Sequence, residues 1–110
     1  MGIEHKSLVD GRWQNFTLYE QMANIGSEVE RALNWRAKGN PAYSERAYHR
    51  ALELCDFTLA DLKNLPRAKE LARGREALVD YFQGSNEYGS SDKLLRQYYF
   101  AFAYAARRNR

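Results

Sequence analysis

The sequence predicts an all-α fold, an up-down-up-down four-helix bundle with a short N-terminal arm over residues 1–16. Apolar residues recur at spacings of three and four along most of the 110 residues, which is the period of amphipathic helices. Stop signals near Gly39, near Leu65 and in the 84–90 loop divide the chain into four helices. Because the connections are short, neighbouring helices must run antiparallel. With 45% hydrophobic residues, residues 1–110 can fill the core of a single domain.

The first helix is predicted over residues 17–38. Thr17 and Glu20 have the spacing of a capping box, in which each side chain bonds the backbone N–H of the other residue. Gly39 provides the stop at the other end. The apolar positions between them are spaced four, three, four and three, so they form one stripe that faces a partner: Leu18, Met22, Ile25, Val29 and Ala32.

The second and third helices are separated by a proline. Asn40 and Pro41 supply a cap and a first residue with a preset φ for a second helix over residues 41–63. Pro66 lacks an N–H group and disfavours helical backbone in the residue before it. The second helix is therefore expected to end just before Pro66, and a third helix is expected to follow at once over residues 66–83.

The fourth helix, predicted over residues 91–108, is apolar around its whole circumference. Ser90 or Ser91 can cap it, and the segment 94–106 contains only two plainly polar residues. A helix in a lone four-helix bundle needs only one apolar face, so the outer side of this helix requires a cover.

A second subunit is the simplest cover for the fourth helix, and we expect a homo-oligomer, with a dimer favoured. The N-terminal arm, with Trp13 and Phe16, is the competing cover. The candidate interface residues are Tyr99, Phe100 and Tyr104.

Arg75 interrupts the apolar stripe of the third helix. A guanidinium keeps its charge and is costly to bury, so Arg75 needs a carboxylate partner. Facing residues across antiparallel turns have numbers of constant sum, which places Asp56 and Glu28 within about one turn of Arg75, and Tyr98 can add a hydroxyl. We interpret this cluster as a structural ion pair that fixes the register, with a small-anion pocket as the alternative.

A basic pole is the second candidate site. The chain carries 17 Lys and Arg against 14 Asp and Glu, a net charge of +3, and the surplus lies in residues 56–110. The start of the third helix and the end of the fourth lie at one pole of the predicted bundle. Beside aromatic residues such as Tyr104, basic side chains suit RNA or single-stranded nucleic acid. The alternative is that they offset a helix dipole and keep the protein soluble. The basic pole comprises Lys63, Arg67, Arg107, Arg108 and Arg110.

No catalytic residue, cofactor or metal site is predicted. Glu45, His49 and Glu53 share a helical stripe, but this stripe lies opposite the apolar face and is interpreted as solvated. Ferritin-like metal sites need Glu-x-x-His elements on facing helices, which this chain does not contain. Cys55 lies in an apolar stretch without a histidine predicted beside it, so it is assigned to the core.

The sequence also indicates a compartment. A single cysteine excludes an intramolecular disulfide, and with it a disulfide-stapled secreted fold. Residues 1–10 lack the apolar segment of a signal peptide, and no apolar run approaches the roughly 20 residues that span a bilayer. We therefore expect a cytoplasmic protein without membrane contact.

The pair Arg46 and His49 invites one comparison. Small intracellular helical bundles include the HEPN families, which bind or cut RNA, and the chain is similar to them in size and helix count. Their motif separates an arginine from a histidine by four to six residues, whereas two residues lie between Arg46 and His49. No family is assigned on this basis.

Three functional hypotheses follow. The leading one is a non-enzymatic interaction module that self-associates. The first alternative is a nucleic-acid-binding accessory protein that uses the basic pole. The second alternative is a HEPN-like RNA-processing or small-anion-binding bundle built around Arg75, or around Arg46 and His49.

Overall fold

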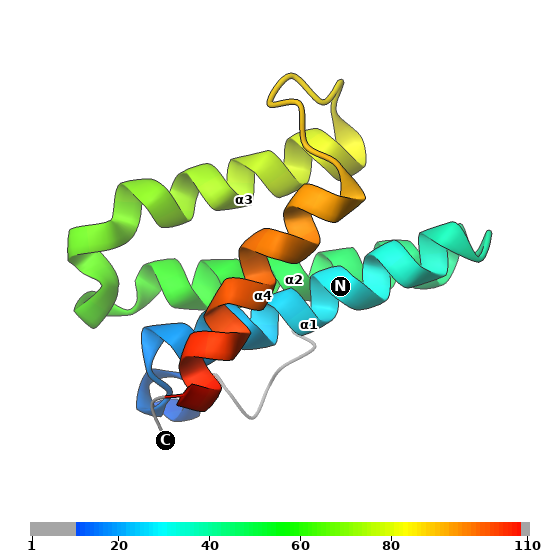
Figure 1. The fold of residues 1–110 in the computed structure, drawn as a ribbon. Coiled ribbons are helices and arrows are strands. Elements are labelled where there is room, and N and C mark those ends of the chain that lie inside the picture. The colour runs from blue at the N-terminus through cyan, green and yellow to red at the C-terminus, as the bar shows by residue number, and fades with distance from the viewer. Residues whose placement is uncertain (1–10, 109–110) are drawn as a thin grey trace.

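The computed structural model describes residues 11–108, and every regular element in that range is helical. The four α-helices alternate in direction along the chain, as the sequence predicts (Figure 1). Two short 3-10 segments lie before α1 and before α3. The elements are η2 Trp13–Asn15, α1 Leu18–Ala37, α2 Pro41–Ala60, η3 Leu62–Arg67, α3 Ala68–Gln83 and α4 Asp92–Arg108.

The predicted signals at the ends of α1 and at the start of α2 are all present. Thr17 and Glu20 form both bonds of the capping box, at 2.9 and 3.1 Å. Gly39 has a φ of +78°, a backbone conformation that glycine adopts without strain, and it turns the chain between the two helices. The Asn40 side chain then accepts the backbone N–H of Tyr43, so Pro41 begins α2 as expected.

The break between α2 and α3 lies earlier than the sequence predicts. Helix α2 ends at Ala60, because Asp61 is extended and its carboxylate caps η3 by accepting the backbone N–H of Lys63. Pro66 lies inside η3, and α3 begins only at Ala68. The aspartate, rather than the proline, therefore ends the second helix.

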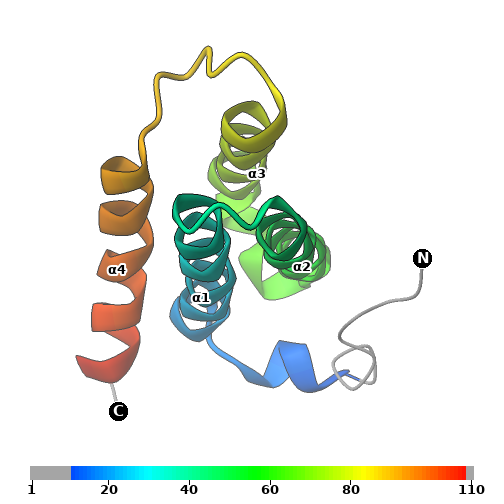
Figure 2. The ribbon, with the colours of Figure 1, turned by 90° about the vertical axis from the view of Figure 1, so that its right-hand side faces the viewer.

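Helix α1 lies at the centre of the arrangement. It packs along α2 on one side and along α4 on the other, while α3 packs on α2 (Figure 2). The 84–91 loop carries the chain across from α3 to α4. Helix α4 is consequently attached to the rest of the molecule mainly through α1.

The core follows the same arrangement. Helices α1 and α2 contribute most of its buried apolar side chains, and α3 and α4 contribute two each. The predicted stripe of α1 faces this core. The buried apolar side chains of the described residues are Trp13, Met22, Ile25, Val29, Ala32, Leu33, Ala47, Tyr48, Ala51, Leu54, Cys55, Leu71, Leu78, Leu95 and Tyr99.

The described part of the N-terminal arm does not cover α4. Trp13 is only 1% exposed, and its indole N–H donates to the hydroxyl of Thr58 at the end of α2, at 3.1 Å. Phe16 packs edge-on against Trp13, at 5.6 Å between ring centroids. The competing cover predicted from Trp13 and Phe16 is therefore wrong for these residues, and residues 1–10 of the arm lie outside the described part.

Candidate interaction surfaces

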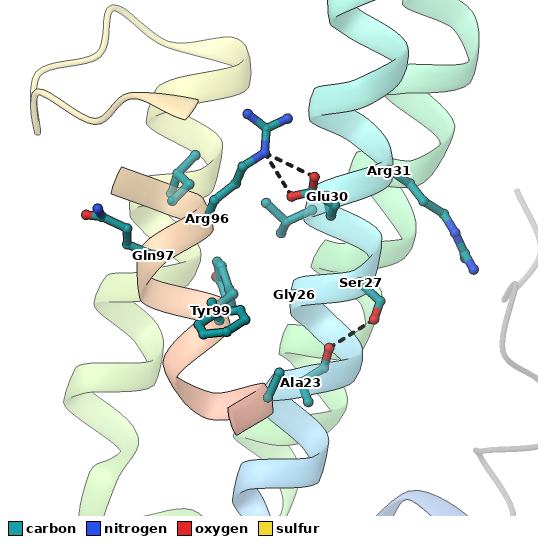
Figure 3. Close-up of a pocket in the computed structure, with 12 residues that line it drawn as sticks. Ala23, Gly26, Ser27, Glu30, Arg31, Arg96, Gln97 and Tyr99 are labelled. Carbon is teal, nitrogen blue, oxygen red and sulfur yellow. Dashed lines mark hydrogen bonds and ion pairs between the residues drawn. The ribbon is translucent and has the colours of Figure 1, made fainter. Parts of the chain in front are cut away.

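A groove with a volume of about 700 Å³ lies between α1 and α4 (Figure 3). Small residues of α1 form one wall, namely Ala23, Gly26 and Ser27. Tyr99 and Phe100 of α4 line the other. These walls are apolar or small, so the groove suits contact with another apolar surface.

Three polar side chains that line this groove, Ser27, Glu30 and Arg96, form hydrogen bonds within α1 and α4. The Arg96 guanidinium of α4 donates to both oxygens of Glu30 on α1, at 2.9 and 3.1 Å, and also to Asn34. The Ser27 hydroxyl donates to the carbonyl of Ala23. The contacts of Arg96 with Glu30 and Asn34 fasten α4 to α1.

The face of α4 that points away from α1 carries large apolar side chains in contact with solvent. Leu94, Phe100 and Tyr104 are 53%, 62% and 53% exposed, and Tyr98 is also exposed. Of the three residues predicted for an interface, Phe100 and Tyr104 therefore lie on the surface. Tyr99 is buried between α1 and α4, and burial holds its phenol pKa well above 10, so its side chain belongs to the core.

The predicted cluster around Arg75 forms only in part. Its guanidinium donates to Asp56 at 2.8 Å, but the two side chains are 33% and 58% exposed, so the pair lies at the rim. Glu28 is bonded instead to Arg31 and Arg50. The void beside Arg75 measures about 10 Å³, which is about the space that one water needs. This void is too small to hold an anion larger than a water molecule.

Tyr98, the fourth member predicted for this cluster, contributes to the contact between α4 and α3. Its hydroxyl lies near Gly74 of α3, where a Cβ on the glycine would be 3.9 Å away. Its ring packs edge-on against Tyr99 and Phe102. Burial raises its pKa, so the phenol stays neutral at physiological pH.

Two cations of the predicted basic pole are neutralised locally. The Lys63 ammonium pairs with Asp61, and Arg67 makes a forked contact with Glu70. Arg107 lies over the ring of Phe100, 5.9 Å from its centroid, and Arg108 is exposed. Arg110 lies outside the described residues.

A basic and aromatic cluster that the sequence did not suggest lies at the tip of the α1–α2 hairpin. The Trp35 and Tyr43 rings pack edge to face, with centroids 4.8 Å apart. The Lys38 ammonium lies 5.2 Å from the Trp35 centroid, and the Arg46 guanidinium lies 5.7 Å from that of Tyr43. Counting charge by halves of the chain missed this cluster, because six of the seven acidic residues of 1–55 lie outside residues 31–50 of the sequence.

The remaining candidate residues, His49 and Cys55, take part in contacts within the fold. His49 is 3.9 Å from Glu45, and within residues 11–108 no three His, Cys, Asp or Glu side chains are placed to hold a metal ion. Cys55 is buried, which raises its thiol pKa to about 12. Among the described helices, none has the length and hydropathy to cross a membrane.

Comparisons with protein-family models, with curated proteins and with solved structures find no match to this chain.

Proposed function

We propose that this chain is a helical interaction module that forms a homodimer through the outer face of α4. The supporting observation is the solvent-exposed aromatic face of a helix that is packed on its opposite side alone. Large contiguous apolar patches on a soluble domain commonly mark a partner surface. Tyrosine and phenylalanine are also enriched at the centres of such interfaces.

The residue spacing along this face supports a helix as the occupant. Exposed positions fall at Leu94, Gln97, Ala101 and Tyr104, spaced three, four and three. This is the a and d spacing by which one helix packs against another along a narrow seam. The small Ala101 side chain at the middle lets two helices approach closely.

The charges at the ends of α4 support a second copy in the antiparallel direction. Asp92 lies in the first turn, and Arg107 and Arg108 lie in the last. An antiparallel pair sets Arg107 and Arg108 of the two copies at opposite ends of the seam, whereas a parallel pair sets the arginines of both copies together. The two helix dipoles also oppose each other in the antiparallel pair.

The size of the face sets the expected strength. The 17 residues of α4 form a face about 25 Å long and about 10–12 Å wide. The area of this face is well below the roughly 800 Å² that each partner buries in a standard interface. The groove wall of α1 must add to the contact. We therefore expect a dimer that dissociates in the micromolar range.

Sedimentation equilibrium from micromolar to millimolar concentration tests this proposal. The wild-type chain is expected to pass from monomer to dimer, and Ala101→Glu is expected to stay monomeric because it sets two like charges at the centre of the seam. Ala42→Glu is the matched control, since Ala42 is an exposed alanine of α2. A wild-type mass of 12.8 kDa at every concentration, or an Ala101→Glu variant that dimerises like wild type, would overturn the proposal.

A further inference from the structure

The tip of the α1–α2 hairpin has a higher net positive charge than the whole chain. Residues 31–50 contain five Arg and Lys side chains and one Glu, a net charge of +4, while the whole chain carries +3. In Figure 2 this tip faces the viewer and α4 lies to one side of it. It is therefore a different surface from the proposed dimer face.

Three of these cations have no carboxylate partner among the described residues. Arg31 and Arg50 both bond Glu28, but no acidic side chain of residues 11–108 lies within ion-pair distance of Arg36, Lys38 or Arg46. Each of the three lies over an aromatic ring instead. Arg36 is 5.2 Å from the centroid of Tyr81 on α3. Their charges therefore remain available to an anionic partner.

The rings of the tip are held in fixed positions. The backbone N–H of Asn40 donates to the carbonyl of Trp35 at 2.9 Å, which closes the end of α1. The Asn40 side chain caps α2 at Tyr43, so one residue positions both rings. Tyr43 is exposed and Trp35 partly so. Rigid, accessible rings of this kind are platforms for base stacking.

We propose that this tip, formed by Trp35, Lys38, Tyr43 and Arg46, binds single-stranded nucleic acid. A base that stacks on the Trp35 ring takes the place of the Lys38 side chain, and the released ammonium can then bind the adjacent phosphate. Arg46 and Tyr43 offer the same exchange one step along the strand. Alternating rings and cations match the alternating bases and phosphates of an unpaired strand, whereas an acidic protein surface would use the cations alone.

Fluorescence anisotropy with a fluorescein-labelled dT12 oligonucleotide tests the proposal on the full chain. The double variant Lys38→Gln/Arg46→Gln is expected to bind at least tenfold more weakly. A plot of the logarithm of its binding constant against the logarithm of the salt concentration should be shallower by about 1.4, because each lost phosphate contact on a single strand removes about 0.7 from the slope. The matched control is Lys69→Gln/Arg73→Gln, which removes two exposed cations of α3 that lie in neither proposed surface and is expected to keep wild-type affinity.

Tryptophan emission gives a second readout that charge alone would not change. Trp13 is buried, so quenching by dT12 reports stacking on Trp35. Trp35→Leu is expected to abolish the quenching and to weaken binding roughly 5- to 150-fold, the range for one lost stacked base.

Four results would overturn the proposal. The wild-type chain fails to bind dT12, or both double variants lose affinity equally. Alternatively, polyglutamate competes as well as unlabelled dT12, or vesicles containing phosphatidylserine bind the chain while dT12 does not. Each of these results leaves the dimer proposal untouched, because it concerns a different surface.

Discussion

Tyr99 of α4 packs its Cβ directly against the backbone of Gly26 on α1. A Cβ built on Gly26 would lie 2.7 Å from that atom, a separation that real Cβ atoms essentially never have. Glycine at position 26 is thus what allows α4 to lie against α1 and Tyr99 to reach the core. Because α4 is attached mainly through α1, this contact determines where the proposed dimer face stands.

Gly26→Ala is expected to destabilise the protein, although alanine favours a helix by about 1 kcal/mol over glycine. The steric clash involves a Cβ close to the α4 backbone, so α4 must shift, at a typical cost of about 1–3 kcal/mol. Urea unfolding measures the change. Gly74→Ala is the matched control, because its new Cβ meets only the Tyr98 hydroxyl at 3.9 Å, and it is expected to leave stability unchanged or to raise it.

Alkylation of Cys55 provides an independent check on Gly26→Ala. Burial raises the thiol pKa to about 12, so the native wild-type protein is expected to react slowly. Tyr99 lines the small void that Cys55 also lines. A shift of α4 should therefore increase the rate of alkylation, and an unchanged rate together with unchanged stability would contradict the steric argument.

Arg75→Met is expected to cost about 0–1 kcal/mol, the value for a solvent-exposed ion pair. The sequence alone places the pair either inside the bundle or at its edge, and removing one partner of a buried pair costs about 3–5 kcal/mol. The exposed fractions of Arg75 and Asp56 decide between them. Denaturant unfolding gives the answer, and a loss above about 2 kcal/mol would mean that the pair is desolvated in solution.

The helix ends could be predicted wherever the signal is local. Thr17 and Glu20 are three residues apart, and Asn40 precedes Pro41, so both starts follow from short-range chemistry. The partner of Glu28 could not be predicted in the same way. The constant-sum rule treats facing helices as neighbours, but α3 packs mainly on α2, so Arg50 of α2 reaches Glu28 and Arg75 does not.

For a related reason, the polar network beneath η2 could not be predicted from the sequence. It joins five buried side chains from four elements, and the bonds that link Trp13 and Gln21 to the other three span 40 to 45 residues of sequence. Gln21 donates both to the carbonyl of Trp13 and to Asp61, while Asn64 donates to Gln21, each at 2.9 Å. Only the assembled fold brings the five together: Trp13, Gln21, Thr58, Asp61 and Asn64.

Thr58→Val is expected to destabilise the protein by about 1–3 kcal/mol, because it leaves the buried indole N–H of Trp13 without an acceptor. Valine keeps the shape of threonine, so the loss reports the hydrogen bond. Thr58→Ser keeps the hydroxyl and serves as the control. Urea unfolding followed by tryptophan emission should rank wild type above serine and serine above valine, and the reverse order of the two variants would refute this assignment.

Asp61 makes the free energy of unfolding depend on pH in the acidic range. Burial by itself raises the pKa of this carboxyl, but hydrogen bonds from Lys63 and Gln21 outweigh it, so the pKa lies below its usual value. The unfolded chain, with an ordinary Asp pKa near 3.9, then binds the proton more readily than the folded one. The contribution of Asp61 is complete above about pH 4 and is lost as the pH falls through the folded pKa.

Lys63→Gln is therefore expected to raise the pKa of Asp61 and to shift the acid loss of stability toward higher pH. Lys69→Gln, which removes the charge of an exposed lysine on α3, is expected to leave the acid profile of the wild type unchanged. Thermal unfolding between pH 2 and pH 7 compares the three proteins. Parallel profiles for wild type and Lys63→Gln would mean that Lys63 does not stabilise the Asp61 carboxylate, and the acid sensitivity would then have to come from another group.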